Sequence, residues 1–301
     1  MQWRALKYFD TVARCRSLRQ AAARLHIAPT AVSRQIDQLE HQLGAPLLER
    51  GPEGIRLTAA GELLAEQARR TLRDLERVEA RIADLQGMRT GRVAIEAAEG
   101  LVSSLLTPAL TDLNRDYPRL EFDIAIASAG GVIDALRRGD TDIGLAFFLP
   151  PRDDILRVAT AGLEHCVVMA PSHPLAADEE VSLEAALAHP LALPDDSYGV
   201  RQALDRAAKS RGLQYAPSFT TASLETQKAL AMAGAAVLIL PAMAVARECQ
   251  QGTLTAVPLE EGALGWARID LCIYRHRSPS PAVQTCLERL ETALGGWAAE
   301  L

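Results

Sequence analysis

The chain has 301 residues, 49% of them hydrophobic, and a formal net charge of −6 at pH 7. This length exceeds what one hydrophobic core usually supports, so two or three folding units are expected. No apolar run is long enough to span a membrane, and the charged, amphipathic N-terminus differs from a secretory signal peptide. We therefore expect a cytoplasmic protein that does not insert into a membrane.

The cysteines and histidines show no pattern typical of a disulfide framework or a metal site. The cysteines are widely separated and form no C-x-x-C pair, which favours reduced, structural thiols over a redox sensor. They are Cys15, Cys166, Cys249, Cys272 and Cys286. The six histidines lack ligand spacing, so neither a metal nor another cofactor is expected.

The charge is divided unevenly along the chain. Residues 1–57 contain nine Lys and Arg but five Asp and Glu, a net charge of +4, so the remaining residues carry −10. A basic N-terminal part on an acidic body favours binding of a polyanion through the N-terminal part alone.

Residues 17–40 are typical of two short helices joined by a tight corner. A helix over residues 2–14 precedes them and should bury Trp3, Leu6, Phe9, Val12 and Ala13. Ser17 and Gln20 form a capping box, and Pro29 suits the first turn of the second helix. That helix should bury the stripe Val32, Ile36, Leu39 and Leu43. Its polar first turns fit a helix-turn-helix that reads a DNA major groove, although an ordinary helical hairpin has the same spacing.

The N-terminal segments closely resemble the LysR-type transcriptional regulators. The similar stretches are WRALKYFDTVA, SLRQAAARLHIAPTAVSRQIDQLEHQLGAPLLER and GIRLTAAGE, within residues 1–61, and the remaining 240 residues resemble that family more loosely. The resemblance implies a winged helix-turn-helix head over residues 1–58. It implies DNA contacts from Pro29, Thr30, Ser33, Arg34, Arg50 and Arg56.

The wing is expected over residues 46–57, as two short strands joined by a turn at residues 51–54. Two positions depart from the family pattern. Glu53 stands where a basic residue is common, and Ala28 replaces a Ser or Thr that would cap the second helix of the pair, a cap worth roughly 1 kcal/mol.

Residues 59–86 are predicted to form one long helix, capped by Thr58. Hydrophobic and small residues recur every three and four positions, as in a coiled coil. They are Gly61, Leu64, Ala68, Thr71, Leu75, Val78, Ile82 and Leu85. A single amphipathic helix packed on its own domain is the alternative. The resemblance implies that this helix pairs two chains, that residues 87–91 form a hinge, and that dimers assemble further into tetramers.

From Arg92 onward the pattern alternates between strands and helices. Strands are predicted at residues 92–98, 120–128, 141–148, 163–170, 190–195, 218–222, 235–241 and 268–275. This alternation predicts an α/β architecture with mostly parallel sheets. The resemblance implies a fold like that of periplasmic solute-binding proteins, with lobe I formed by residues 92–161 and 267–301 and lobe II by residues 162–266.

Two such lobes bind small molecules in the cleft between them, at the carboxyl ends of strands. Four strand–helix junctions supply Ser and Gly residues there, and helix N-termini can hold an anion, although each Ser could simply cap its helix. The candidate effector-binding residues are Glu99, Gly100, Ser103, Ser128, Phe147, Phe148, Ser197, Tyr198, Arg201 and Ser223. An acid at Glu99 favours an amino or hydroxyl group on the ligand, and Arg201 favours an anion unless it pairs with Asp205.

Three classes of function compete for this pattern. A transporter's solute-binding protein would explain only residues 92–301. An enzyme would need a nucleophile elbow, a metal cluster or a dinucleotide loop, and the sequence contains none. A transcriptional regulator explains the basic head, the long helix and the lobes together. The expected partners are operator DNA with dyad symmetry, a small-molecule effector, further copies of the chain and RNA polymerase.

Overall fold

The computed structural model describes residues 3–51, 54–85 and 91–297. The chain divides near Gln86 into an N-terminal unit and a C-terminal unit. The expected wing-tip residue Glu53 and most of the expected hinge, residues 87–90, lie outside the described residues.

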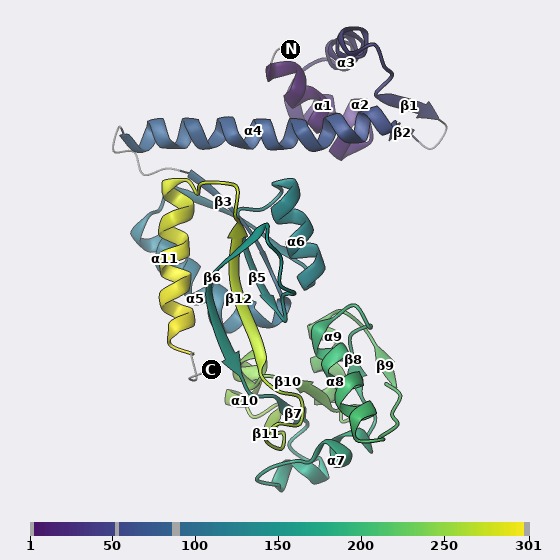
Figure 1. The fold of residues 1–301 in the computed structure, drawn as a ribbon, viewed down its shortest axis with the longest axis vertical. Coiled ribbons are helices and arrows are strands. Elements are labelled where there is room, and N and C mark those ends of the chain that lie inside the picture. The colour runs from purple at the N-terminus through teal and green to yellow at the C-terminus, as the bar shows by residue number, and fades with distance from the viewer. Residues whose placement is uncertain (1–2, 52–53, 86–90, 298–301) are drawn as a thin grey trace. The chain divides into compact units, whose positions relative to one another are not determined.

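The N-terminal unit packs three helices, a β-hairpin and a long helix around one core (Figure 1). Phe9, Ile36 and Leu39 are buried at its centre, as the helical periodicity predicted. The elements are α1 (Trp3–Cys15), α2 (Leu18–Leu25), α3 (Pro29–Leu43), β1 (Leu48–Gly51), β2 (Gly54–Leu57) and α4 (Ala59–Leu85).

Two residues that we expected to be buried in this unit are instead exposed. Trp3 is 56% and Leu43 42% exposed. Trp3 is the first residue of α1 and Leu43 the last of α3. The predicted buried faces of α1 and α3 are correct, but each prediction included one terminal residue too many. No neighbouring element covers these two terminal residues.

The ends of the helices follow the sequence signals. The Ser17 hydroxyl accepts a hydrogen bond from the Gln20 N–H, and the Thr58 hydroxyl accepts one from the Gly61 N–H at 3.0 Å. Ala28 supplies no side-chain cap to α3, as expected. Gly61 admits no side chain, because a Cβ there would lie 2.1 Å from the Leu47 carbonyl oxygen. α4 therefore docks directly onto the strand region of the head.

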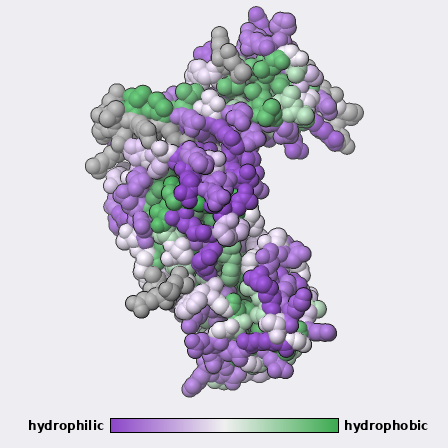
Figure 2. All heavy atoms as spheres, in the orientation of Figure 1, coloured by the Kyte–Doolittle hydropathy of each residue, from purple (hydrophilic) through white to green (hydrophobic). Residues whose placement is uncertain are grey.

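The hydrophobic stripe of α4 is buried within the chain at its N-terminal end and exposed at its C-terminal end. Leu64 packs against the core of the head and Ala68 is fully buried, whereas Leu75, Val78 and Ile82 are 39%, 52% and 52% exposed. Hydrophobic residues gather along the C-terminal part of α4 in Figure 2. The coiled-coil interpretation therefore needs correction over its first turns, where the stripe packs within the chain. The Leu85 side chain lies outside the described part of the structure.

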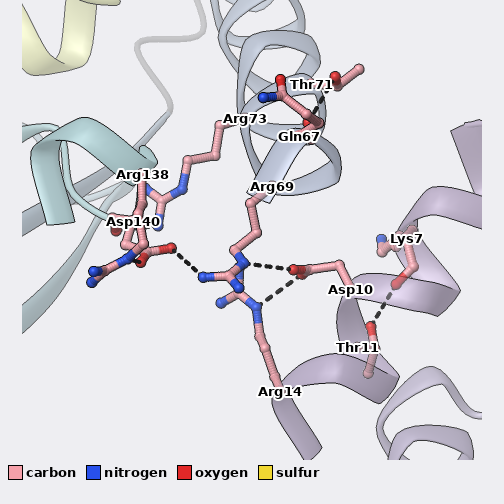
Figure 3. Close-up of polar contacts among 10 residues, drawn as sticks. All are labelled: Lys7, Asp10, Thr11, Arg14, Gln67, Arg69, Thr71, Arg73, Arg138 and Asp140. Atoms are coloured by element: carbon pink, nitrogen blue, oxygen red, sulfur yellow. Dashed lines mark hydrogen bonds and ion pairs between the residues drawn. The ribbon is translucent and has the colours of Figure 1, made fainter. Parts of the chain in front are cut away.

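A buried carboxylate joins α4 to α1 (Figure 3). Asp10 is 8% exposed and lies between Arg14, at 2.9 Å, and Arg69, at 3.5 Å. Burial raises the pKa of Asp10, although the two arginines oppose that shift. The first turns of α4 are thus held to the head by an ion pair as well as by apolar packing.

In the C-terminal unit, lobe I is built on a five-stranded sheet in the order β4-β3-β5-β12-β6. Its strands are β3 (Gly91–Ala97), β4 (Leu120–Ile126), β5 (Ile143–Phe147), β6 (Ile155–Leu163) and β12 (Ala267–Tyr274). β3 pairs in parallel with β4 and β5, whereas β12 runs antiparallel to β5 and β6. Alternate residues face opposite sides: Leu145 packs toward α5 (Thr107–Asp116) and α11 (Pro281–Gly295), and Ala146 toward α6 (Ala129–Arg138).

Lobe II contains smaller sheets, and its main sheet is antiparallel. The order is β10-β7-β11, and a parallel pair β8-β9 lies in the same lobe. The strands are β7 (Cys166–Met169), β8 (Ala192–Leu193), β9 (Phe219–Thr220), β10 (Leu238–Leu240) and β11 (Thr255–Pro258). The helices are α7 (Leu183–Leu187), α8 (Gly199–Ser210), α9 (Leu224–Met232) and α10 (Ala246–Gln250), with the 3-10 turns η3 (Pro174–Ala177) and η4 (Ala242–Val245).

Several predicted elements of this unit were wrong or missing. β6 and β11 were not predicted, because Arg157, Thr160 and Gly162 interrupt the apolar pattern of β6. β6 also runs to Leu163, past Ala161, where the first segment of lobe I was expected to end and the chain to cross into lobe II. The predicted helix over residues 101–118 consists of a 3-10 turn, η1 (Glu99–Leu101), a π-helical turn, η2 (Val102–Leu106), and α5. The mostly parallel prediction fails for the main sheet of lobe II, since strand pairing direction depends on connections that periodicity does not reveal.

The described helices include none that is both long enough and apolar enough to cross a membrane. Within residues 3–51, 54–85 and 91–297, no cluster of three or more His, Cys, Asp or Glu side chains is placed to hold a metal ion.

Candidate functional site

α3 presents one apolar face to the head and an opposite polar face to solvent. Val32, Ile36 and Leu39 are buried on the inner face. At a helical pitch of 3.6 residues, Thr30 and Arg34 lie roughly opposite that stripe, and both are exposed. Pro29 is exposed at the first turn, and Ser33 lies partly buried on the flank. The helix therefore offers a hydroxyl and a guanidinium on its free face, the groups that read base edges and phosphates.

The hairpin β1-β2 stands beside α3 and is fastened to it by Glu40. The Glu40 carboxylate accepts hydrogen bonds from the N–H groups of Leu47, at 2.7 Å, and Leu48, at 3.1 Å. Arg50 pairs with Ile55 in the hairpin and Arg56 with Glu49, and Arg56 is exposed. The sequence did not predict this role of Glu40, because a Glu near the end of a polar helix face has no distinguishing pattern.

A pocket in the C-terminal unit lies where the four predicted strand–helix junctions meet. Its walls include Glu99 and Gly100 after β3, Ser128 after β4, Phe147 and Phe148 at the end of β5, and Tyr198 before α8. The volume is ≈ 130 Å³, near the ~150 Å³ of an engineered cavity that holds one benzene ring. The further lining residues are mostly apolar: Ala98, Ile126, Ala127, Ala129, His165, Pro194, Gly199, Val200, Ala222, Leu224, Gln227, Ile239, Leu240, Pro241 and Ala244.

Four predicted effector residues do not line this pocket, and each has a structural reason. Ser103 is exposed on η2. The Ser223 hydroxyl caps α9 by accepting from the Thr226 N–H at 3.2 Å. The Ser197 N–H donates to Asp195 within a turn. The Arg201 guanidinium pairs with Asp205 at 3.1 Å and stacks over the Tyr215 ring.

Glu99 connects the two lobes across the pocket. Its Oε2 accepts a hydrogen bond from the Leu224 N–H at 2.7 Å, at the first residue of α9. Helix N-termini attract anions because their first N–H groups lack intrahelical partners. A carboxylate of lobe I therefore already occupies the anion position of α9 in lobe II.

Phe148 of lobe I also contacts lobe II. Its backbone adopts a left-handed conformation, with φ of 55°, which costs on the order of 1 kcal/mol for a residue with a side chain. Its side chain packs on Gly199, where an added Cβ would lie 2.4 Å from the Phe148 Cβ. The Phe148 ring also stacks on His165, with ring centroids 6.0 Å apart.

His165 lines the pocket but was absent from the predicted site. It is 3% exposed, its Nδ1 lies 3.1 Å from the Gly265 carbonyl oxygen, and its Nε2 has no hydrogen-bond partner among the described residues. A carbonyl can only accept, so Nδ1 carries the proton and Nε2 is an acceptor. The sequence predicted a strand over residues 163–170, but His165 lies in the short connection between β6 and β7, where strand alternation does not show which way a side chain points.

The buried His165 predicts a loss of stability on acidification. Burial lowers the pKa of His165, outweighing the hydrogen bond to Gly265. Because the pKa is lower in the folded state, the unfolded state takes up a proton first as pH falls. The contribution of the neutral His165 to the free energy of unfolding is complete above the unfolded-state pKa of about 6.5, and it is lost as the pH falls below that value. Urea denaturation at pH 7.5 and 5.5 should show a larger loss of unfolding free energy in the wild type than in His165→Gln.

His276→Gln is the matched control for that measurement, since His276 is exposed. It should follow the pH dependence of the wild type. An identical pH dependence in the wild type and in His165→Gln would contradict the assignment of a neutral, buried imidazole.

The head is a helix-turn-helix with an exposed polar face, and it is joined to a two-lobed α/β unit with a pocket between its lobes. This combination defines a ligand-responsive DNA-binding regulator. Comparison with known proteins specifies the family. The family model for the LysR substrate binding domain matches residues 86–295, and that for the bacterial regulatory helix-turn-helix protein, lysR family, matches residues 3–62. The chain belongs to the LysR family of DNA-binding transcriptional regulators, which carry an effector-binding domain.

Curated relatives are similar over most of their length. A hydrogen peroxide-inducible genes activator of Pectobacterium carotovorum subsp. carotovorum is 28% identical, over 86% of this chain and 85% of that protein. The uncharacterized HTH-type transcriptional regulator YybE of Bacillus subtilis (strain 168) is 26% identical, over 80% of this chain and 82% of that protein. These relatives are transcriptional regulators and not enzymes.

Solved structures share the fold. Full-length CbnR in complex with its target DNA has a TM-score of 0.71 and 24% identity, covering 97% of this chain and 100% of that chain. A full-length OxyR variant from Pseudomonas aeruginosa has a TM-score of 0.75 and 21% identity, covering 100% of this chain and 99% of that chain. The winged helix-turn-helix and two-lobed α/β architecture predicted from the sequence is thereby confirmed.

Proposed function

We propose that α3 enters the major groove of an operator and that the hairpin β1-β2 follows the adjacent backbone. Pro29, Thr30, Ser33 and Arg34 stand on the first two turns of α3, which are the turns that reach base edges in this motif. Arg50 and Arg56 on the hairpin contribute contacts to phosphates, which add affinity without sequence preference. The observation that carries this proposal is the exposed polar face of α3, backed by its buried stripe.

Two chains pair through the C-terminal part of α4 and present two heads to one operator. Leu75, Val78 and Ile82 are exposed in the single chain although they continue a hydrophobic stripe, and apolar stripes on helices are stabilised by pairing. Two identical heads related by a twofold axis bind inverted half-sites. Further assembly into tetramers would use the C-terminal units.

A small effector binds in the pocket between the lobes and changes the balance between two arrangements of the protein on DNA. A ligand shifts such a balance only by its differential affinity, typically worth about 1–3 kcal/mol. Glu99 and Phe148 already join the lobes across this pocket, so an effector that contacts them bears on both lobes. In this proposal the protein acts in the cytoplasm with RNA polymerase as a partner, uses no cofactor and catalyses no reaction.

The thiols support sensing of a ligand over sensing of peroxide. Burial raises the pKa of Cys272 and of Cys286 to about 12, and also raises the pKa of Cys166 and of Cys249. The thiolate is the species that reacts with oxidants. These four thiols are therefore poorly suited to the role that the name of the Pectobacterium relative describes.

Selection of bound sequences from a pool of random duplexes tests the regulatory function. The full-length chain should enrich sites that contain two inverted half-sites, because paired heads have twofold symmetry. A variant with Thr30→Ala and Arg34→Ala should enrich no common sequence while it still binds duplex DNA weakly at low salt. Enrichment of unrelated sequences by the wild type would contradict the proposal.

A further inference from the structure

The charges around the pocket point to the chemical class of its ligand. Glu99 is the only charged side chain among the lining residues, all of which are described, and no lysine or arginine lines the walls. The nearby cation Lys228 is 6% exposed and is held by Glu225 at 2.5 Å and Glu248 at 3.0 Å. Arg201 is paired with Asp205. An anionic ligand would therefore find no basic side chain in the pocket wall.

The N-terminus of α9 is already in use. The Leu224 N–H of α9 donates to Glu99, and the Thr226 N–H donates to the Ser223 hydroxyl. A carboxylate that bound at the N-terminus of α9 would have to displace the Glu99 carboxylate. Two like charges held a few ångströms apart in a poorly solvated site repel strongly. The charge of Glu99 thus disfavours an anionic ligand beside it.

The pocket instead presents the acceptor oxygens of Glu99. Glu99 Oε2 is bonded to Leu224, and a carboxylate has further lone pairs on both oxygens. Phe147 and Phe148 add aromatic rings to the same wall, and aromatic faces attract cations. The Glu99 carboxylate and the two rings together favour a ligand with a hydrogen-bond donor that carries a positive charge.

We propose that the effector is a compact apolar amine, bound as its ammonium form with Glu99 as the counter-ion. The proposal rests on the proposed function of the pocket and specifies its ligand class. The ≈ 130 Å³ volume limits the apolar body to about one ring or a short branched chain. Because Glu99 also bonds to Leu224, the ammonium group would act on the contact that joins the lobes.

Three molecules of nearly equal size test this ligand class on the full-length protein at pH 7. Benzylamine, benzyl alcohol and sodium benzoate share one ring and differ in charge. Isothermal titration calorimetry at constant ionic strength should show benzylamine binding at least tenfold more tightly than benzyl alcohol, and benzoate binding more weakly than either. A preference for benzoate, or binding of none of the three, would overturn the proposal.

Glu99→Gln supplies the decisive variant, because its side-chain carbonyl can still accept from the Leu224 N–H while the charge is lost. It should bind benzylamine at least tenfold more weakly than the wild type and benzyl alcohol about equally. Glu184→Gln, which removes an exposed acid of α7, should behave as the wild type. An unchanged amine preference in Glu99→Gln would overturn the role of Glu99.

DNA binding measured in parallel separates this inference from the proposed function. A protein that binds a selected inverted repeat but shows no amine preference would refute the ligand class alone. A protein that binds no DNA sequence specifically would refute the proposed function, whatever the calorimetry shows.

Discussion

Arg34→Ala should weaken binding to a selected operator by about 1–3 kcal/mol per half-site, roughly 5- to 150-fold. Arg34 is exposed on the second turn of α3, roughly opposite the buried residues Val32 and Ile36. A guanidinium there can bond to a guanine edge or to a phosphate, and alanine can do neither. Fluorescence anisotropy with a labelled duplex, at one fixed salt concentration, measures the change.

The control for Arg34 is Arg4→Ala, which removes one positive charge from an exposed position of α1 in the same head. It should reduce the affinity for specific and unrelated duplexes by a similar small factor, because general electrostatic attraction does not depend on sequence. If Arg34→Ala bound the operator like the wild type, α3 would not be the helix in the groove.

Leu75→Asp combined with Ile82→Asp should separate chains that are paired through α4. Both side chains are exposed in the single chain and lie on the stripe that the helical spacing predicts. Pairing would bury two carboxylates per chain against apolar side chains, at a cost of several kcal/mol. Sedimentation at micromolar concentration should show a mass reduced by at least half. Operator affinity should fall by on the order of 10²–10⁴, because the second head no longer binds with the first.

Leu63→Asp is the matched control for the α4 variant. Leu63 is 64% exposed on the same helix but lies outside the stripe, so a charge there should leave the sedimenting mass unchanged. A wild-type chain that sedimented as a monomer at micromolar concentration would refute pairing through α4.

Local signals in the sequence predicted the head almost completely. Ser17, Pro29 and Thr58 marked the beginnings of α2, α3 and α4, and the stripe of α3 was correct except at its last residue, Leu43. Such caps and stripes act between residues three or four apart, so the chain order contains them directly. The exposed Thr30 and Arg34 follow from the same periodicity.

The pocket was predicted from the sequence only in part. The four junctions were found from strand ends, and the structure brings Glu99, Ser128 and Tyr198 together at one pocket. Ser103, Ser197, Arg201 and Ser223 came from the same junctions but do not line it. A junction supplies both cleft-facing and outward-facing residues, and only the rotation of each turn decides between them.

The sequence by itself determined the helix caps, the hydrophobic stripes and the strand–helix alternation, because these depend on residues close together in the chain, and its resemblance to the LysR-type regulators supplied the class of protein. Only the tertiary structure placed His165 on the pocket wall, paired Arg201 with Asp205, and brought Glu99 to the N-terminus of α9. Glu99 and Leu224 are 125 positions apart. A contact of that separation forms through the packing of two lobes, and that packing decided which charge the pocket offers to a ligand.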